Sequence, residues 1–266
     1  AEVPAFGKEY TWRFTSATKG PGKLYHFSTL NGPSADTSKV RLRILKKAER
    51  YEDGYVFLDG NAVLYDMKGN PVWFLPNNFE TVKSNEHSEH DGHNHGGHSH
   101  AAGGIKDLRD MKITSRGTIT FINDDMPYEI SYSGEILWKG TDTGYVSKDN
   151  EEHYHHEVNR LSNGHYMVLG DEFAQSKLFS DSSGKNGGGY IPLKMTKFGT
   201  VIEYDEKGKV VWSWKSSGHY KDKQLYNTRK PNGVTENTIH ENSFYFDEKN
   251  KMLYVGFKHI SQILKI

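Results

Sequence analysis

Apolar and polar residues alternate along much of the chain, and Tyr, Phe, Trp, Val and Ile occupy many of the apolar positions. A period of two, interrupted by short turns that contain Gly, Asn or Asp, is typical of β-strands joined by hairpins. Long runs rich in Leu, Ala and Glu, which would favour helices, are few. The pattern therefore predicts an all-β protein.

One strand–turn–strand unit occurs in three copies, at residues 62–73, 128–138 and 201–212. In each copy a Trp falls four residues after the turn glycine, and the three pairs are Gly69 with Trp73, Gly134 with Trp138, and Gly208 with Trp212. Because glycine adopts a positive φ at no steric cost, each copy predicts a β-hairpin closed by its glycine.

A second recurrent piece, in which a more apolar strand follows a turn, spans 111–123, 156–169 and 240–258. Two hairpins per repeat make four antiparallel strands, and this is the content of a β-propeller blade. We expect blades to begin near Tyr51, Gly104, Glu152 and Thr238. The alternative is a β-sandwich with accidental internal similarity.

The repeats divide the chain into N-terminal strands at 1–50, as a partial blade or a small β extension, and propeller blades at 51–266. The last blade stops at Ile266 before its outer hairpin, whereas propellers close with about four to eight blades. We therefore expect strands within Glu9–Phe14 and Lys39–Lys46, or a further polypeptide segment, to complete the propeller.

Residues 84–104 interrupt the blade pattern as a loop insertion that holds six of the 14 histidines. Neutral imidazoles spaced two or three residues apart can capture a divalent metal such as Zn, Cu or Ni. The candidate ligands are His87, His90, His93, His95, His98 and His100. The alternative is a solvated spacer that binds metal only adventitiously.

Composition excludes several classes of function. The 266 residues include 34 basic and 34 acidic side chains, so there is no net charge to attract nucleic acid. The absence of cysteine excludes disulfides, thiolate metal sites and a cysteine nucleophile. No apolar run approaches the length of a membrane span, in agreement with a mean hydropathy of -0.77.

Outside the insertion, histidines concentrate at His153, His155, His156 and His240. His156 and His240 open the innermost strands of two expected blades, and such strands line a propeller's central channel, where ligand sites are expected. Each histidine can instead have a local structural role. A channel metal site formed by His155, His156, His240 and Glu157 is a further alternative.

Several stretches resemble the arylsulfotransferases of the aryl-sulfate type. They are 53–58, 64–66, 72–73, His155–Val158, Leu161–Gly164, 201–205, 210–212, Thr238–Ser243, Leu253–His259 and 263–266. The resemblance runs from Asp53 to Ile266 and implies an exported, six-bladed β-propeller. Such an enzyme moves a sulfuryl group from an aryl sulfate to a phenol without nucleotide sulfate and requires no cofactor.

The resemblance also implies a site at the bottom of the channel. The catalytic residues would be His156, His240, Lys258 and His155, and the substrate-binding residues would be Asn242, Glu157 and His259. Lys258 stands where the family has arginine, so it keeps the charge but lacks the planar fork. The family's nucleophilic histidine lies in a later blade, beyond Ile266, and His153, His155 and His259 are the substitutes that this chain offers.

Two other functions stay open at this stage. One is a non-enzymatic propeller that binds a ligand through its channel face. The other is a polysaccharide-acting propeller that uses His, Tyr and Lys for proton abstraction. Export agrees with the N-terminus Ala1–Pro4, which resembles a mature end left by signal cleavage.

Overall fold

A computed structural model describes residues 7–29, 40–46, 50, 52–76, 105, 107–149, 151–176, 194–220 and 239–266. Within these ranges the regular structure is β-strand with short 3-10 turns such as Asp59–Asn61 and Ser216–Gly218, so the all-β prediction is confirmed. The histidine-rich insertion at 84–104 lies outside the described residues. Contacts divide the chain into Ala1–Pro76 and Asn77–Ile266. The expected boundary between residues 50 and 51 stays a prediction.

The first unit contains a long hairpin and a small sheet. In the hairpin, β1 (Glu9–Trp12) pairs with β4 (Tyr25–Ser28), and β2 (Thr15–Ser16) pairs with β3 (Gly20–Pro21). The sheet has the order β5 (Tyr55–Leu58), β6 (Val63–Asp66) and β7 (Pro71–Phe74). Val63, Tyr65 and Phe74 form its buried core. Residues 40–46 contain no strand, so the expectation of a strand there is not met in that part.

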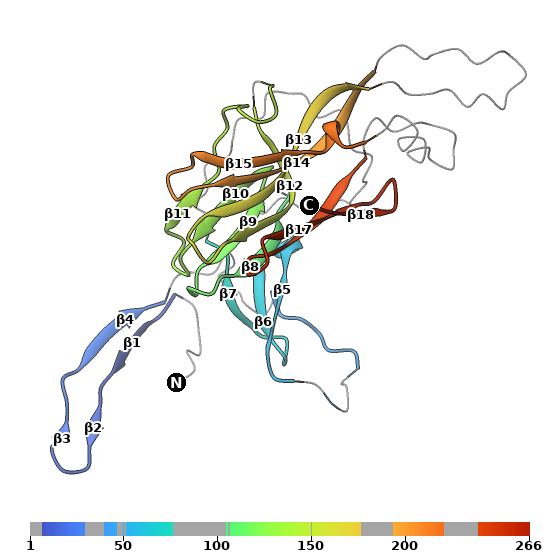
Figure 1. The fold of residues 1–266 in the computed structure, drawn as a ribbon. Coiled ribbons are helices and arrows are strands. Elements are labelled where there is room, and N and C mark those ends of the chain that lie inside the picture. Colours follow the sequence, from blue (N-terminus) through green and yellow to red (C-terminus); the bar gives the residue numbers. More distant parts are fainter. Residues whose placement is uncertain are drawn as a thin grey trace, which may run out of the picture. The chain divides into compact units, whose positions relative to one another are not determined.

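The described residues of the second unit form three antiparallel sheets (Figure 1). The first has the order β11 (Ile136–Lys139), β10 (Met126–Ile130), β9 (Ile119–Asn123) and β8 (Arg109–Ile113). The second has the order β12 (His153–Arg160), β13 (Tyr166–Ser176), β14 (Lys194–Tyr204) and β15 (Val210–Lys215). The third has the order β16 (Glu241–Asp247), β17 (Met252–Phe257) and β18 (Gln262–Lys265). Two of these sheets therefore have the four strands expected of a blade.

The three repeated hairpins use one turn geometry. Gly69, Gly134 and Gly208 have φ of 80°, 89° and 78°, and each glycine N–H donates to the carbonyl of the residue three positions earlier. In all three hairpins the strand register then shifts by a bulge beside the turn. A turn that closes on a left-handed glycine and a bulge is a common hairpin connection, and the predicted role of these glycines is confirmed.

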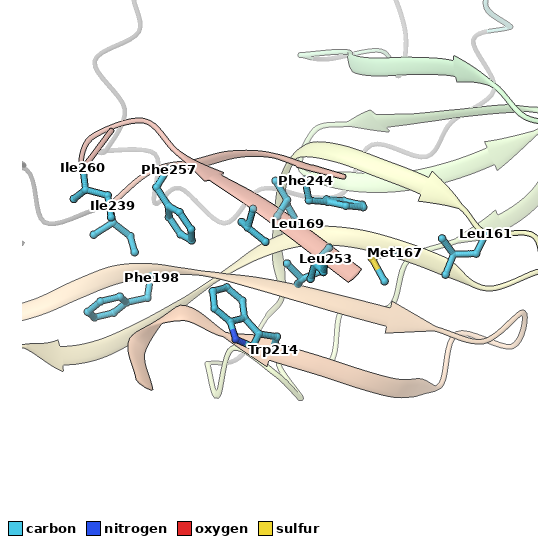
Figure 2. Packing of buried hydrophobic residues seen from close by; sticks show 12 residues of the cluster. Leu161, Met167, Leu169, Phe198, Trp214, Ile239, Phe244, Leu253, Phe257 and Ile260 are labelled. Atoms are coloured by element: carbon cyan, nitrogen blue, oxygen red, sulfur yellow. The ribbon is translucent and has the colours of Figure 1, made fainter. Parts of the chain in front are cut away.

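A cluster of buried apolar side chains joins the β12–β15 and β16–β18 sheets. Figure 2 shows Leu169 and Trp214 of the former near Phe244, Leu253 and Phe257 of the latter. These side chains are almost completely buried. Because apolar burial contributes about 25 cal/mol per Å², this contact holds the two sheets together and sets the positions of their neighbouring edges.

The strands β8, β12 and β16 each lie at the end of their own sheet, and β12 contacts both of the others. Ionic contacts tie these edges together. The ammonium of Lys112 on β8 lies 2.8 Å from Asp110 Oδ2 and 3.1 Å from Glu157 Oε1 on β12. Glu157 Oε2 in turn accepts a hydrogen bond of 2.7 Å from the backbone N–H of Phe244 on β16. Residues from three sheets are thereby brought to one place.

Candidate functional site

Each of the three neighbouring edges contains a residue with left-handed backbone. The φ angles are 55° at Asp110, 56° at His156 and 53° at His240, and the strand register shifts at or beside each of them. For an L-residue this conformation costs about 1–2 kcal/mol. Bulges of this kind redirect side chains, and they are frequent beside functional sites.

The two histidines with left-handed backbone face each other. His156 Nε2 lies 3.2 Å from His240 Nε2, within hydrogen-bond distance, although the two residues are 84 positions apart in the chain. Their ring centroids are 5.2 Å apart, and the centroid of His259 lies 4.8 Å from that of His240. The structure therefore assembles His156, His240 and His259, three of the residues singled out from the sequence.

Lys258 and His259 reach this place from the turn between β17 and β18. The backbone N–H of Lys258 donates to the carbonyl of His240 at 2.9 Å, and that of His259 donates to Ile239 at 3.3 Å. Because both residues lie in the turn, the alternation of side chains in a regular strand does not apply to them. The exposed ammonium of Lys258 acts electrostatically on His240.

Burial and neighbouring cations keep the facing imidazoles neutral. Burial, followed by the charges of His155 and Arg109, lowers the pKa of His156 to about 4. Burial, followed by His156, His259 and Lys258, lowers the pKa of His240 to about 4. A neutral imidazole can donate one proton through one ring nitrogen and accept another proton at the second nitrogen. Near pH 7 the pair is therefore equipped for hydrogen bonding and proton transfer.

Behind His156 lies an ionic cluster within the β12–β15 sheet. His155 Nε2 is 3.1 Å from Asp171 Oδ1, and Lys197 Nζ is 2.7 Å from Asp171 Oδ2. Burial raises the pKa of Asp171, but the charges and hydrogen bonds of His155 and Lys197 outweigh it and bring the pKa to about 2. Sequence reasoning found His155 and missed its partners. The available signal was a carboxylate next to the apolar run of β13.

A second buried carboxyl, Glu241, directly follows His240. Ser216 Oγ donates to Glu241 Oε1 at 2.9 Å. Burial, followed by the charge of Asp171, raises the pKa of Glu241 to about 7. Gly199 makes room for this carboxyl, because a Cβ at that position would lie 1.9 Å from the Glu241 Cδ. Sequence analysis did not predict the role of Glu241 or that of Gly199.

The other candidates lie in different surroundings. Glu157 joins three strands through Lys112 and Phe244, as described above. Asn242 is exposed at the bulge of β16. His153 lies 3.9 Å from Asp149 and packs edge-on against Phe173, with ring centroids 6.3 Å apart. The substrate contacts expected for Glu157 and Asn242 stay predictions.

Within the described part of the chain, no group of three or more His, Cys, Asp or Glu residues is arranged to hold a metal ion. The alternative of a channel metal site formed by His155, His156, His240 and Glu157 is therefore not supported. The six histidines of the insertion lie outside the described residues, so their metal binding stays a prediction. Among the described residues, no helix is both long and apolar enough to cross a bilayer.

The architecture and the site define a class: an all-β protein of antiparallel sheets whose neighbouring edges gather histidines and cations. The family model described as Arylsulfotransferase (ASST) matches residues 43–266. The chain therefore belongs to the arylsulfotransferase family, which is a family of β-propellers. The number of blades stays a prediction. No curated protein matches the chain.

Proposed function

We propose that this protein transfers a sulfuryl group from an aryl sulfate to a phenol at the site formed by His156, His240 and Lys258. The observation that carries the proposal is the 3.2 Å approach of the two Nε2 atoms, which come from neighbouring sheets in a member of the arylsulfotransferase family. Small aromatic sulfates and phenols are accordingly the proposed substrates.

The proposed exchange converts ArO–SO3⁻ and Ar′OH into ArOH and Ar′O–SO3⁻. The bond between sulfur and the donor oxygen breaks, its electron pair stays on that oxygen, and the oxygen takes up a proton. The acceptor hydroxyl loses a proton and forms the new oxygen–sulfur bond. Proton donation to the leaving phenolate and proton removal from the acceptor are the tasks of general acid–base catalysis.

The neutral imidazoles of His156 and His240 suit these two tasks. One neutral ring can accept the proton of the acceptor phenol, and the imidazolium formed in this way can return a proton to the leaving phenolate oxygen. The N–H of the other ring can donate a hydrogen bond to a sulfuryl oxygen. Negative charge spreads over the sulfuryl oxygens during transfer, as it does in phosphoryl transfer, and fixed cationic donors stabilise it. Lys258 contributes such a charge from the turn after β17.

His155 belongs to the proposed site through its ring contact with His156. As a substitute nucleophile it is poorly placed, because both of its ring nitrogens are buried. His259 is partly exposed and lies next to His240, so it is the better placed of the substitutes. A histidine nucleophile would divide the exchange into two half-reactions and produce ping-pong kinetics.

The polysaccharide-acting alternative needs a tyrosine that can lose its proton. Burial raises the pKa of Tyr154, and burial raises that of Tyr204 to about 12. Their hydroxyls are 2.6 Å apart and buried. These two tyrosines have the environment of packing residues, which favours the sulfuryl-transfer proposal. Export of the protein is part of the same proposal and rests on the family.

The test is turnover of 4-nitrophenyl sulfate in the presence of phenol, followed through release of 4-nitrophenolate. We expect His240→Ala and His156→Ala each to reduce kcat by at least about 100-fold, the usual contribution of an acid–base group. His165→Ala is the matched control, because His165 contacts Glu203 at 2.7 Å and takes no part in the site. Binding of the aryl sulfate without turnover would contradict the proposal and favour the binding module.

A further inference from the structure

Two consecutive residues of β12 place their rings on the same side of the strand. In a regular strand, successive side chains point to opposite faces. The bulge between Tyr154 and Val158 breaks this alternation, and the ring centroids of His155 and His156 lie 5.1 Å apart with their planes at 82°. The ring of His155 therefore meets that of His156 edge-on.

His155 itself is anchored from the neighbouring strands. Its side chain is only 12% exposed, and its Nε2 contacts Asp171, whose side chain is 4% exposed on β13. Asp171 is in turn held by Lys197 on β14. The chain of contacts from Lys197 through Asp171 to His155 therefore crosses three adjacent strands of one sheet and ends at the ring beside His156.

These contacts bear on the left-handed backbone of His156. Such a conformation persists only where surrounding contacts determine it. A buried carboxylate that holds the adjacent ring limits the positions that His156 can adopt opposite His240. Carboxylates behind functional histidines orient rings in this way in other sites.

We propose that Asp171 is a positioning residue that, by holding His155, fixes the His156 imidazole opposite His240. This inference rests on the proposed function for its consequence in turnover, but not for its structural content. Other charged or titratable groups that act on the His156 imidazole are Arg109 on β8, Lys197 on β14 and His240. Asp171 differs from them in its direct contact with His155.

The variant Asp171→Asn tests the proposal, because it keeps the shape of the side chain and removes its charge. Glu172→Gln is the matched control. Glu172 is the next residue on β13, is equally buried, and pairs with a lysine, Lys215, at 2.6 Å. Both variants therefore remove a buried carboxylate from a lysine pair, and only the first contacts His155.

The first readout is the set of imidazole signals of the uniformly ¹⁵N-labelled protein, assigned with His156→Gln and His240→Gln. We expect the ring nitrogens of His156 and His240 to shift in Asp171→Asn and to keep their wild-type positions in Glu172→Gln. Should Asp171→Asn fail to fold, His155→Phe keeps the ring volume and removes both nitrogens, and it is expected to move the same signals. Unchanged His156 and His240 signals in the folded variant would overturn the proposal.

The second readout is turnover of 4-nitrophenyl sulfate. We expect kcat to fall by about 10- to 100-fold in Asp171→Asn, with KM within about twofold of wild type, as for other residues that act through a neighbour. Glu172→Gln should keep the wild-type kcat. If the wild-type protein shows no turnover while the imidazole signals still shift only in Asp171→Asn, the transfer function fails and the positioning role holds.

Discussion

Histidines 156 and 240 occupy a backbone conformation that favours glycine, and this separates their chemical role from their contribution to stability. With a φ of 53° at residue 240, any side chain that has a Cβ strains the backbone there. We expect the free energy of unfolding of His240→Gly to exceed that of His240→Ala by about 1 kcal/mol, although both variants lack the imidazole.

Chemical denaturation of the two variants measures this difference. The control pair is His153→Gly and His153→Ala, at the first residue of β12, which has no positive φ. At residue 153 the glycine variant should be the less stable of the two, because glycine within a strand lowers the free energy of unfolding by about 0.5–1 kcal/mol relative to alanine. The same order at both positions would show that residue 240 is not strained in solution.

The raised pKa of Glu241 makes the stability of the fold depend on pH. Burial and Asp171 raise its pKa from 4.5 to about 7, so the folded protein holds this proton more tightly than the unfolded chain does. The stabilisation is fully present below about pH 4.5 and is lost as the pH rises through about 7. The variant Glu241→Gln lacks this loss.

Urea unfolding of wild type and Glu241→Gln between about pH 5 and pH 8 checks the sign. We expect the unfolding free energy of the variant, minus that of wild type, to increase with pH across this range. Ser216→Ala serves as the comparison, since it removes the hydrogen bond to Glu241 and leaves the carboxyl titratable. Parallel curves for wild type and Glu241→Gln would contradict a raised pKa.

Among the elements, the turns have the clearest determinants. Gly117 closes the turn between β8 and β9 with φ of 75°, and a Cβ at this position would meet no atom within 4 Å. Gly117→Ala should therefore lower the free energy of unfolding by about 1–2 kcal/mol through backbone strain alone. Gly218→Ala, also with open space but without positive φ, should be neutral or slightly stabilising. Thermal unfolding of the two variants distinguishes strain from crowding.

The edges of neighbouring sheets depend on Lys112. Its ammonium contacts Asp110 and Glu157, and it donates to Asn159 Oδ1 at 2.8 Å. We expect Lys112→Met to lower the unfolding free energy by about 1–3 kcal/mol, because two half-buried carboxylates lose a charged partner. Lys207→Met, on an exposed turn, should change it by less than about 0.5 kcal/mol. If denaturant titrations gave the same loss of unfolding free energy for Lys112→Met and Lys207→Met, the sheet edges would be held together by packing alone.

At the scale of the whole molecule, anion binding should be coupled to proton uptake. The pKa values of His156 and His240 are both lowered to about 4, so the free site is unprotonated near neutral pH. An anion beside the pair favours the charged imidazole and raises these pKa values. The complex then binds more protons than the free protein, and affinity for the anion rises as the pH falls from about 7 towards 5.

Calorimetric titration with inorganic sulfate, in two buffers of different ionisation enthalpy, measures this uptake directly. The wild-type protein should give different heats in the two buffers, and His240→Gln should give a smaller difference. Identical heats for the wild type in both buffers, with sulfate bound, would contradict the coupling between the anion and the histidine pair.

Local chemistry made much of the fold predictable. A period of two determines which residues can form strands, and a glycine with positive φ determines where a hairpin closes. For this reason the repeated hairpins and the two four-stranded sheets could be predicted from the sequence. The proposal that His156 and His240 belong to a functional site followed from their positions at the start of expected inner strands.

The interior of the site could not be predicted in the same way. Asp171, Lys197 and Glu241 act through partners on other strands, and no local pattern joins them to His155 or His240. The bulge that redirects His156 depends on register with a neighbouring strand. His259 reaches His240 from a turn whose position depends on where β17 ends.

The strand class, the turns, the available histidines and the likeness to a family depend on residues close together in the chain, so all of these could be predicted from the order of amino acids. Packing between sheets establishes which histidine faces which, keeps both facing imidazoles neutral through burial, and puts an Asp171–Lys197 pair behind one of them. Distance, burial and charge at a site depend on this packing because it brings together residues 84 positions apart.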